Sequence, residues 1–224
     1  MQAKFDSASS NTAVANNTIT VSKTSAGGNR LGLVALSLYQ ANKPDNPVVT
    51  WGGVAMTFLA AHNSDYAANR KVIWYYIKNP PESASDVVFS WDTNAYAVLN
   101  VMTFKDVELS SPFGVVAKSN GDSGTITVDV ASDVGDLIVD SAIAETGGET
   151  VGSGQTEIFN NGAANYYGVG SYQVATTTTT TMDWAGTNVE WYQMGVAIKG
   201  PSDPTTDYLT NYRPRKRTPG AVSV

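Results

Sequence analysis

The chain has 224 residues, no cysteine and a formal net charge of −6, and only 15% of its residues are charged. Without cysteine there is no disulfide framework and no thiolate metal site. The acidic balance disfavours nucleic acid as a partner, and no apolar run approaches the ~18 residues that span a membrane. The first residues also lack the basic and apolar regions of a signal peptide, so neither secretion nor a membrane location is expected.

Short segments rich in β-branched and aromatic residues follow one another along the chain, each closed by Gly, Asn, Asp or Pro. This spacing predicts an all-β protein, an antiparallel β-sandwich with a jelly-roll-like arrangement. The adjacent glycines at 52 and 53 predict a two-residue hairpin turn, because glycine accepts the positive φ that such turns need. The predicted strands are Thr18–Lys23, Leu31–Tyr39, Val48–Trp51, Val54–Ala61, Lys71–Lys78, Asp86–Trp91, Ala97–Val107, Thr125–Ala131, Asp136–Glu145, Gln155–Phe159, Gly168–Ala175, Thr178–Trp184 and Glu190–Lys199.

The two halves of the chain are weakly similar to each other. TITV at 18–21 followed by NRLGLVALSLY corresponds to TITV at 125–128 followed by GDLIVDSAIA, and later strands stay in step. We therefore expect one sandwich domain, residues 16–200, built from two degenerate repeats at about 16–110 and 120–200. Either both repeats share one sandwich, or each forms a small sheet that packs on the other. Convergent β-patterning is the alternative explanation.

Some of the predicted strands are apolar at nearly every position instead of alternating. Leu31–Leu38, Leu137–Val139 and Val98–Phe104 show this pattern. A strand with one face in water alternates, so these strands are expected to be covered on both faces. The cover would be a further layer of the same chain or a neighbouring subunit, although small residues packed under loops would give the same pattern.

Two strings resemble serine-protease signatures, GDSG at 121–124 and AAH at 60–62. A nucleophilic serine needs a histidine base within hydrogen-bond reach and a carboxylate that orients it. His62 is the only histidine, and the two strings are much closer in sequence than in the protease fold. We therefore interpret Gly121–Gly124 as a turn before TITV, predict no catalytic residues and expect the protein not to be an enzyme.

A metal or nucleotide cofactor is not expected either. One histidine excludes a multi-histidine centre, which leaves only an oxygen-ligand calcium site with Asp122, Asp133, Asp136 and Glu145 as possible donors. No calcium-loop motif and no phosphate-binding glycine loop accompany them, and carboxylates of this kind are usual in β-turns. We predict no metal site and no cofactor.

Among the many aromatic residues, most are expected to lie in the core. Tyr166 and Tyr167, beside Asn160-Asn161-Gly162, are the best candidates for an exposed aromatic contact with a sugar or a protein. Tyrosine is common in both kinds of interface, so the residue type alone does not choose between them.

The two ends of the chain are predicted to be extended arms, residues 1–15 and 201–224. The C-terminal arm has prolines at 201, 204, 214 and 219 and no core-forming pattern. Its four cations against two aspartates give it a charge of +2, which leaves −8 on the rest of the chain. Its basic residues are expected to bind an acidic protein surface and its aromatic and aliphatic residues to fill shallow pockets; the set is Tyr208, Leu209, Tyr212, Arg213, Arg215, Lys216 and Arg217.

Several strings together resemble a known family: NRLGLVALSLY, then VTWGGVAMTFL, an R-x-x-x-W-Y-Y segment at 70–76, NPP at 79–81 and a closing VAIKGP. Over residues 15–200 the chain is similar to β-sandwich capsid cement or decoration proteins of tailed bacteriophages, including cyanophages. The resemblance implies a structural virion protein, often a homotrimer, on the capsid exterior after assembly in the host cytoplasm. It would bind the major capsid protein and join neighbouring subunits. The alternative is a carbohydrate-binding module on a virion or tail appendage.

Overall fold

The computed structural model describes residues 1–39, 47–63, 70–122, 124–145, 147–188 and 190–201. All regular structure in these residues is β-strand, and the sheets are antiparallel, which confirms the predicted all-β sandwich. No helix long and apolar enough to cross a membrane occurs in this part of the chain. The strands are β1 (Lys4–Lys23), β2 (Leu31–Tyr39), β3 (Val48–Trp51), β4 (Val54–Ala55), β5 (Thr57–Asn63), β6 (Arg70–Lys78), β7 (Ser85–Lys105), β8 (Ala117–Gly121), β9 (Gly124–Ala131), β10 (Leu137–Glu145), β11 (Thr150–Val151), β12 (Thr156–Ala163), β13 (Tyr166–Val174), β14 (Thr179–Asn188) and β15 (Trp191–Ile198).

The strongest local signals predict their elements closely. β2 and β3 have the bounds expected from sequence, and the glycines between β3 and β4 form the predicted hairpin turn. Gly52 and Gly53 both have positive φ, 55° and 80°, as a two-residue turn of this hand requires. The short pairing of Thr50 with Ala55 and of Trp51 with Val54 follows from that turn.

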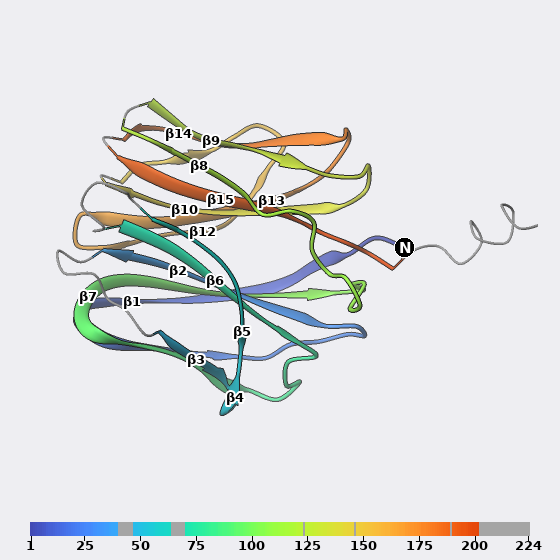
Figure 1. Ribbon diagram of the computed structural model, residues 1–224, viewed down its shortest axis with the longest axis horizontal. Coiled ribbons are helices and arrows are strands. Elements are labelled where there is room, and N and C mark those ends of the chain that lie inside the picture. Colours follow the sequence, from blue (N-terminus) through green and yellow to red (C-terminus); the bar gives the residue numbers. More distant parts are fainter. Residues whose placement is uncertain (40–46, 64–69, 123, 146, 189, 202–224) are drawn as a thin grey trace, which may run out of the picture.

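Two long strands, β1 and β7, organise the first half of the molecule. They pair along nearly their whole length, and three register shifts interrupt the ladder between Phe5 and Thr18. Such irregularities bend strands, and Figure 1 shows β7 curving sharply at the end of the molecule opposite the N-terminus. Each long strand therefore contributes to two layers, one shared with β2, β6 and β5 and one shared with β3.

The second half also has two layers, and its strands are shorter. Its larger sheet has the order β12-β13-β10-β15-β8, and its smaller sheet has the order β11-β14-β9. The turn predicted at Gly121–Gly124 lies between β8 and β9, which belong to different sheets, so it is not a hairpin of paired strands. Its Ser123 lies outside the described residues.

The two larger sheets pack face to face and enclose the central core. That core joins Leu33, Trp74 and Met102 of the first half to Val139 and Val196 of the second. Further cores fill the space between each larger sheet and the outer layer of the same half, so the molecule has four layers, stacked from top to bottom in Figure 1. The apolar runs in β2 and β10 are thus covered on both faces by the same chain, which was one of the two predicted explanations.

The pairings of the two halves correspond. β2 lies between β6 and β7 in the first half, and β10 lies between β13 and β15 in the second. In the outer layers, β7 lies between β3 and β1, and β14 lies between β11 and β9. An ancestral duplication of the sequence remains a prediction. The strands of each half lie in two layers, which belong to one curved seven-stranded sheet in the first half and to two separate sheets in the second.

Two predictions about β1 and β7 are wrong. Residues 1–15 are not a separate arm, because β1 begins at Lys4 and its polar first half is held by backbone hydrogen bonds to β7. The strands predicted at Asp86–Trp91 and Ala97–Val107 are one continuous strand, β7. The polar residues between them resemble a turn in sequence, but they form the curve that carries the strand from one layer to the next.

Candidate functional site

The predicted C-terminal arm leaves the sandwich beside the N-terminus. The ammonium group of Met1 donates a 3.1 Å hydrogen bond to the carbonyl of Pro201, the last described residue. The arm residues singled out from sequence all lie outside the described residues: Tyr208, Leu209, Tyr212, Arg213, Arg215, Lys216 and Arg217. The structure therefore fixes the point from which residues 202–224 depart but describes none of their contacts.

At the opposite end of the molecule, where β7 curves, aromatic and charged side chains of both halves meet. We call this group the tyrosine–arginine cluster. Tyr39 ends β2 and Arg70 begins β6 in the first half, whereas Glu145 ends β10 and Tyr166 begins β13 in the second. Because strand ends of facing sheets gather at one edge, residues far apart in sequence come together there. The complete cluster is Tyr39, Arg70, Tyr96, Glu145, Tyr166 and Glu190.

Arg70 is the centre of this cluster. Its guanidinium group forms ion pairs with Glu145, at 2.6 Å, and with Glu190, and its side chain is only 9% exposed. Its central carbon lies 5.7 Å from the ring centre of Tyr39 and 5.5 Å from that of Tyr166. A buried arginine paired with two carboxylates joins the halves electrostatically, and its planar group also suits contact with aromatic rings. Within the described residues, the Nε of Arg70 has no hydrogen-bond partner.

Tyr166 and Tyr167, the predicted exposed aromatic pair, have different surroundings. Both are half-buried, and they are adjacent in β13, so their side chains point to opposite faces. Tyr166 stacks on Tyr39, whereas the ring of Tyr167 lies against the backbone of Gly147 and Gly162. The two rings therefore do not form one shared exposed surface.

Burial raises the pKa of the Tyr166 phenol well above its ordinary value, and a hydrogen bond to Tyr39 adds to this effect. The nearby charge of Arg70 acts in the opposite direction but does not cancel it. Tyr166 is therefore a neutral phenol near pH 7 and can donate or accept a hydrogen bond. Glu145 and Glu190 keep about a third of their side chains exposed, 34% and 33%, so the cluster has polar groups that solvent can reach.

Sequence reasoning located only one member of the cluster, Tyr166. Arg70 was noted only as part of a short string, and Glu145 only as a possible calcium donor. Glu190 was missed as a site residue, because it stands 120 positions away from the arginine that it contacts. The available signal was a charged residue at the end of an otherwise apolar strand, as at Arg70, which begins β6, and Glu145, which ends β10.

The strings that resemble a protease signature are not joined in the described part of the structure. The Nε2 atom of His62 lies 3.1 Å from the carbonyl oxygen of Ser119, and the imidazole ring meets Tyr192 edge to face. His62 thus extends from β5 of one half to β8 of the other. These contacts give the histidine a packing and hydrogen-bonding role between the halves.

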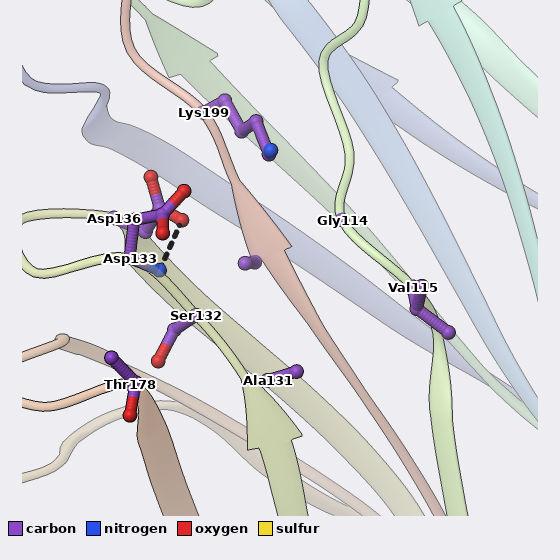
Figure 2. Close-up of a pocket in the computed structure, with 9 residues that line it drawn as sticks. Gly114, Val115, Ala131, Ser132, Asp133, Asp136, Thr178 and Lys199 are labelled. Carbon is purple, nitrogen blue, oxygen red and sulfur yellow. Dashed lines mark hydrogen bonds between the residues drawn. The ribbon is translucent and has the colours of Figure 1, made fainter.

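A shallow pocket of about 270 Å³ opens near the end of β15 (Figure 2). Asp133 and Asp136 lie together in the turn before β10, where the Asp133 N–H donates to the Asp136 carboxylate at 3.0 Å. Lys199 enters from the other side, two residues before Pro201. The pocket could hold one polar side chain or a small polar molecule. Its lining comprises Gly114, Val115, Ala131, Ser132, Asp133, Asp136, Thr178, Ala197 and Lys199.

Of the four carboxylates considered as calcium donors, only Asp133 and Asp136 come together. Glu145 lies in the tyrosine–arginine cluster, and Asp122 follows β8. Among the described residues, no group of three or more His, Cys, Asp or Glu is placed to hold a metal ion.

The second half also contains a fully buried carboxylate, Asp140. It accepts hydrogen bonds from the backbone and hydroxyl of Ser171, both 2.7 Å, from the indole of Trp184 at 2.8 Å and from the amide of Gln193 at 2.7 Å. Burial raises the pKa of Asp140, and the four donors oppose that rise. With every contact made inside the protein, this carboxylate ties the outer layer to the larger sheet and is not accessible to a ligand.

Comparison with known proteins gives no match to a family model, a curated protein or a solved structure.

Proposed function

We propose that this chain is a structural virion protein that binds the outer surface of a phage capsid and joins neighbouring major capsid subunits. The observation that supports it most is the hydrogen bond between Met1 and Pro201, because it fixes the point on the sandwich at which residues 202–224 begin. The sequence of that segment carries +2, and the remainder of the chain carries −8. A basic extension from one point of an acidic module suits an acidic patch on a larger assembly.

In this proposal the sandwich gives shape and the extension gives attachment. The four layers are packed on a shared core, and buried hydrogen bonds join the two halves. One of these is the 2.6 Å bond from the Trp74 indole to the Ser141 hydroxyl. Self-association as a homotrimer would let one particle make several modest contacts with the capsid at once, and these contacts would add up by avidity. The pocket next to Lys199 lies near the departure point and offers a second contact region for the major capsid protein.

The test is co-sedimentation with undecorated capsids of the phage that encodes the chain. The full chain should sediment with capsids, and a variant lacking residues 202–224 should remain in the supernatant. Replacing Arg213, Arg215, Lys216 and Arg217 by Gln should weaken binding and reduce its dependence on salt, because fewer charges are screened. Lys118→Gln is the matched control, since this exposed lysine lies on the sandwich. Unchanged binding by the truncated chain would refute the proposal.

A carbohydrate-binding module is the second candidate, and the tyrosine–arginine cluster favours it. Partly exposed tyrosines beside Arg70 and two carboxylates combine stacking surfaces with hydrogen-bonding groups, as sugar sites do. Tyr96→Ala should then abolish binding on a glycan array, and removal of residues 202–224 should leave it intact. Loss of glycan binding on truncation, with Tyr96→Ala unaffected, would exclude this cluster as the site.

A further inference from the structure

One pair of tyrosines links the two halves at unusually close range. Tyr39 of β2 and Tyr166 of β13 stack with ring centres 3.5 Å apart and an angle of 16° between the rings. The chain has no cysteine, so a disulfide cannot join the halves. Tyrosine is a residue that can form a covalent cross-link under oxidation without any thiol.

We propose that Tyr39 and Tyr166 form a dityrosine cross-link when the protein meets a one-electron oxidant. Each phenol loses one electron and its hydroxyl proton and becomes a phenoxyl radical. The two radicals join through a new carbon–carbon bond between ring positions next to the hydroxyl groups. The hydrogen displaced from each of these carbons moves to the phenol oxygen and restores the aromatic ring. The pair thus loses two protons to solvent and two electrons to the oxidant.

The geometry selects this pair over its neighbours. Tyr96 is 6.2 Å from Tyr39 and 6.4 Å from Tyr166, with rings tilted by 38° and 40°. Tyr167 points to the opposite face of β13. Because radicals held in contact couple much faster than radicals that must first meet by diffusion, the stacked pair outcompetes both other tyrosines and other molecules.

The surroundings allow the reaction to occur. Tyr39 and Tyr166 are only half-buried, so an oxidant can reach their rings. Arg70 lies beside both rings and holds the ends of the two halves together through Glu145 and Glu190, which limits separation of the rings. The product would be a covalent bridge between β2 and β13. It would keep the two halves together under conditions in which ion pairs and stacking fail, whether or not the protein binds a capsid.

The experiment oxidises the dilute full-length chain with tris-bipyridine ruthenium and persulfate under visible light. The monomer should become two hydrogen atoms lighter and acquire dityrosine fluorescence. A tryptic digest should contain one cross-linked species that joins peptide 31–70 to peptide 119–199, and its fragmentation by tandem mass spectrometry should place the link on Tyr39 and Tyr166. The oxidised monomer should also melt at a higher temperature, because the link restricts the unfolded chain.

Two pairs of variants make the test specific. Tyr39→Phe and Tyr166→Phe should each lower the dityrosine fluorescence of the monomer by about tenfold, since the other tyrosine pairs in the described part of the chain are tilted and more than 6 Å apart. Tyr96→Phe and Tyr167→Phe should retain it. A monomer of unchanged hydrogen content, cross-links that join other tyrosines, or cross-links only between molecules would each overturn the proposal. Residue-level assignment of the link in the unaltered chain, by tandem mass spectrometry, decides the matter even if a phenylalanine variant fails to fold.

Discussion

The ammonium group of Lys23 donates a 2.6 Å hydrogen bond to the hydroxyl of Ser7, which lies in the same strand, 16 residues earlier. A straight strand would hold these residues far apart, so the bond exists only because β1 curves with β7 and brings its two ends together. The hydroxyl of Thr103 lies 3.1 Å from Ser7 and donates to Asp6 at 2.9 Å. These hydrogen bonds among β1 and β7 side chains stabilise the curved strands where the layers of the first half meet.

Ser7→Ala should lower the free energy of unfolding by about 1–3 kcal/mol, because the buried ammonium of Lys23 loses its nearest acceptor. Burial already disfavours the charged ammonium group and lowers the pKa of Lys23, so loss of the Ser7 acceptor destabilises that charge further. Urea unfolding measures the change. Ser9→Ala, two positions along the same strand, serves as the control and should stay close to wild type. Equal stability of both variants would show that the bond contributes nothing to the curve.

Asp140→Asn should destabilise the fold by about 2–4 kcal/mol, because an amide has one acceptor oxygen where the carboxylate has two. The new amino group would face either the two donors of Ser171, which now bind Oδ1, or the donors of Trp184 and Gln193, which now bind Oδ2. Thermal and urea unfolding give the difference, with Asp129→Asn as an exposed control. A loss no larger than that of the control would mean that the outer layer does not depend on this carboxylate.

Tyr166 predicts a loss of stability at alkaline pH. Its folded pKa lies above the ordinary value of 10.0, so its contribution is complete below pH 10 and is lost as the pH rises toward the folded pKa. The unfolding free energy of the wild type relative to Tyr166→Phe should therefore fall steadily as the pH rises above about 10. Tyr167→Phe is the control for removal of a phenol. A relative stability that increases over this range would contradict the shift.

Gly32→Ala should cost about 1–3 kcal/mol through overpacking. A Cβ at this position would lie 2.5 Å from the Trp51 ring and 3.0 Å from the Ile77 methyl group, and Trp51 is fully buried. Gly28→Ala, whose added carbon meets nothing within 4 Å, is the matched control. Differential scanning calorimetry compares the two. If the two variants melt at the same temperature, Trp51 moves more readily than its packing indicates.

The candidate site was predictable only in part. The pattern around Tyr166 marked a partly exposed tyrosine, but stacking on Tyr39 depends on the register of β2 and β10 and on how the larger sheets face each other. The ion pair of Arg70 with Glu190 joins residues of different halves. A local pattern reports how much a residue is buried, whereas the identity of its neighbours across a core is a long-range property.

The sequence by itself determined the strand class, the bounds of β2 and β3, the turn at Gly52 and Gly53, and the need to cover both faces of the apolar strands. These depend on side-chain periodicity and on backbone φ, which are local. The tertiary structure alone decided that β1 and β7 are continuous and curved, that the cover comes from four layers, and that Asp140 is buried inside an apolar run. Each of these depends on hydrogen bonds and packing between segments distant in sequence, which a local pattern does not encode.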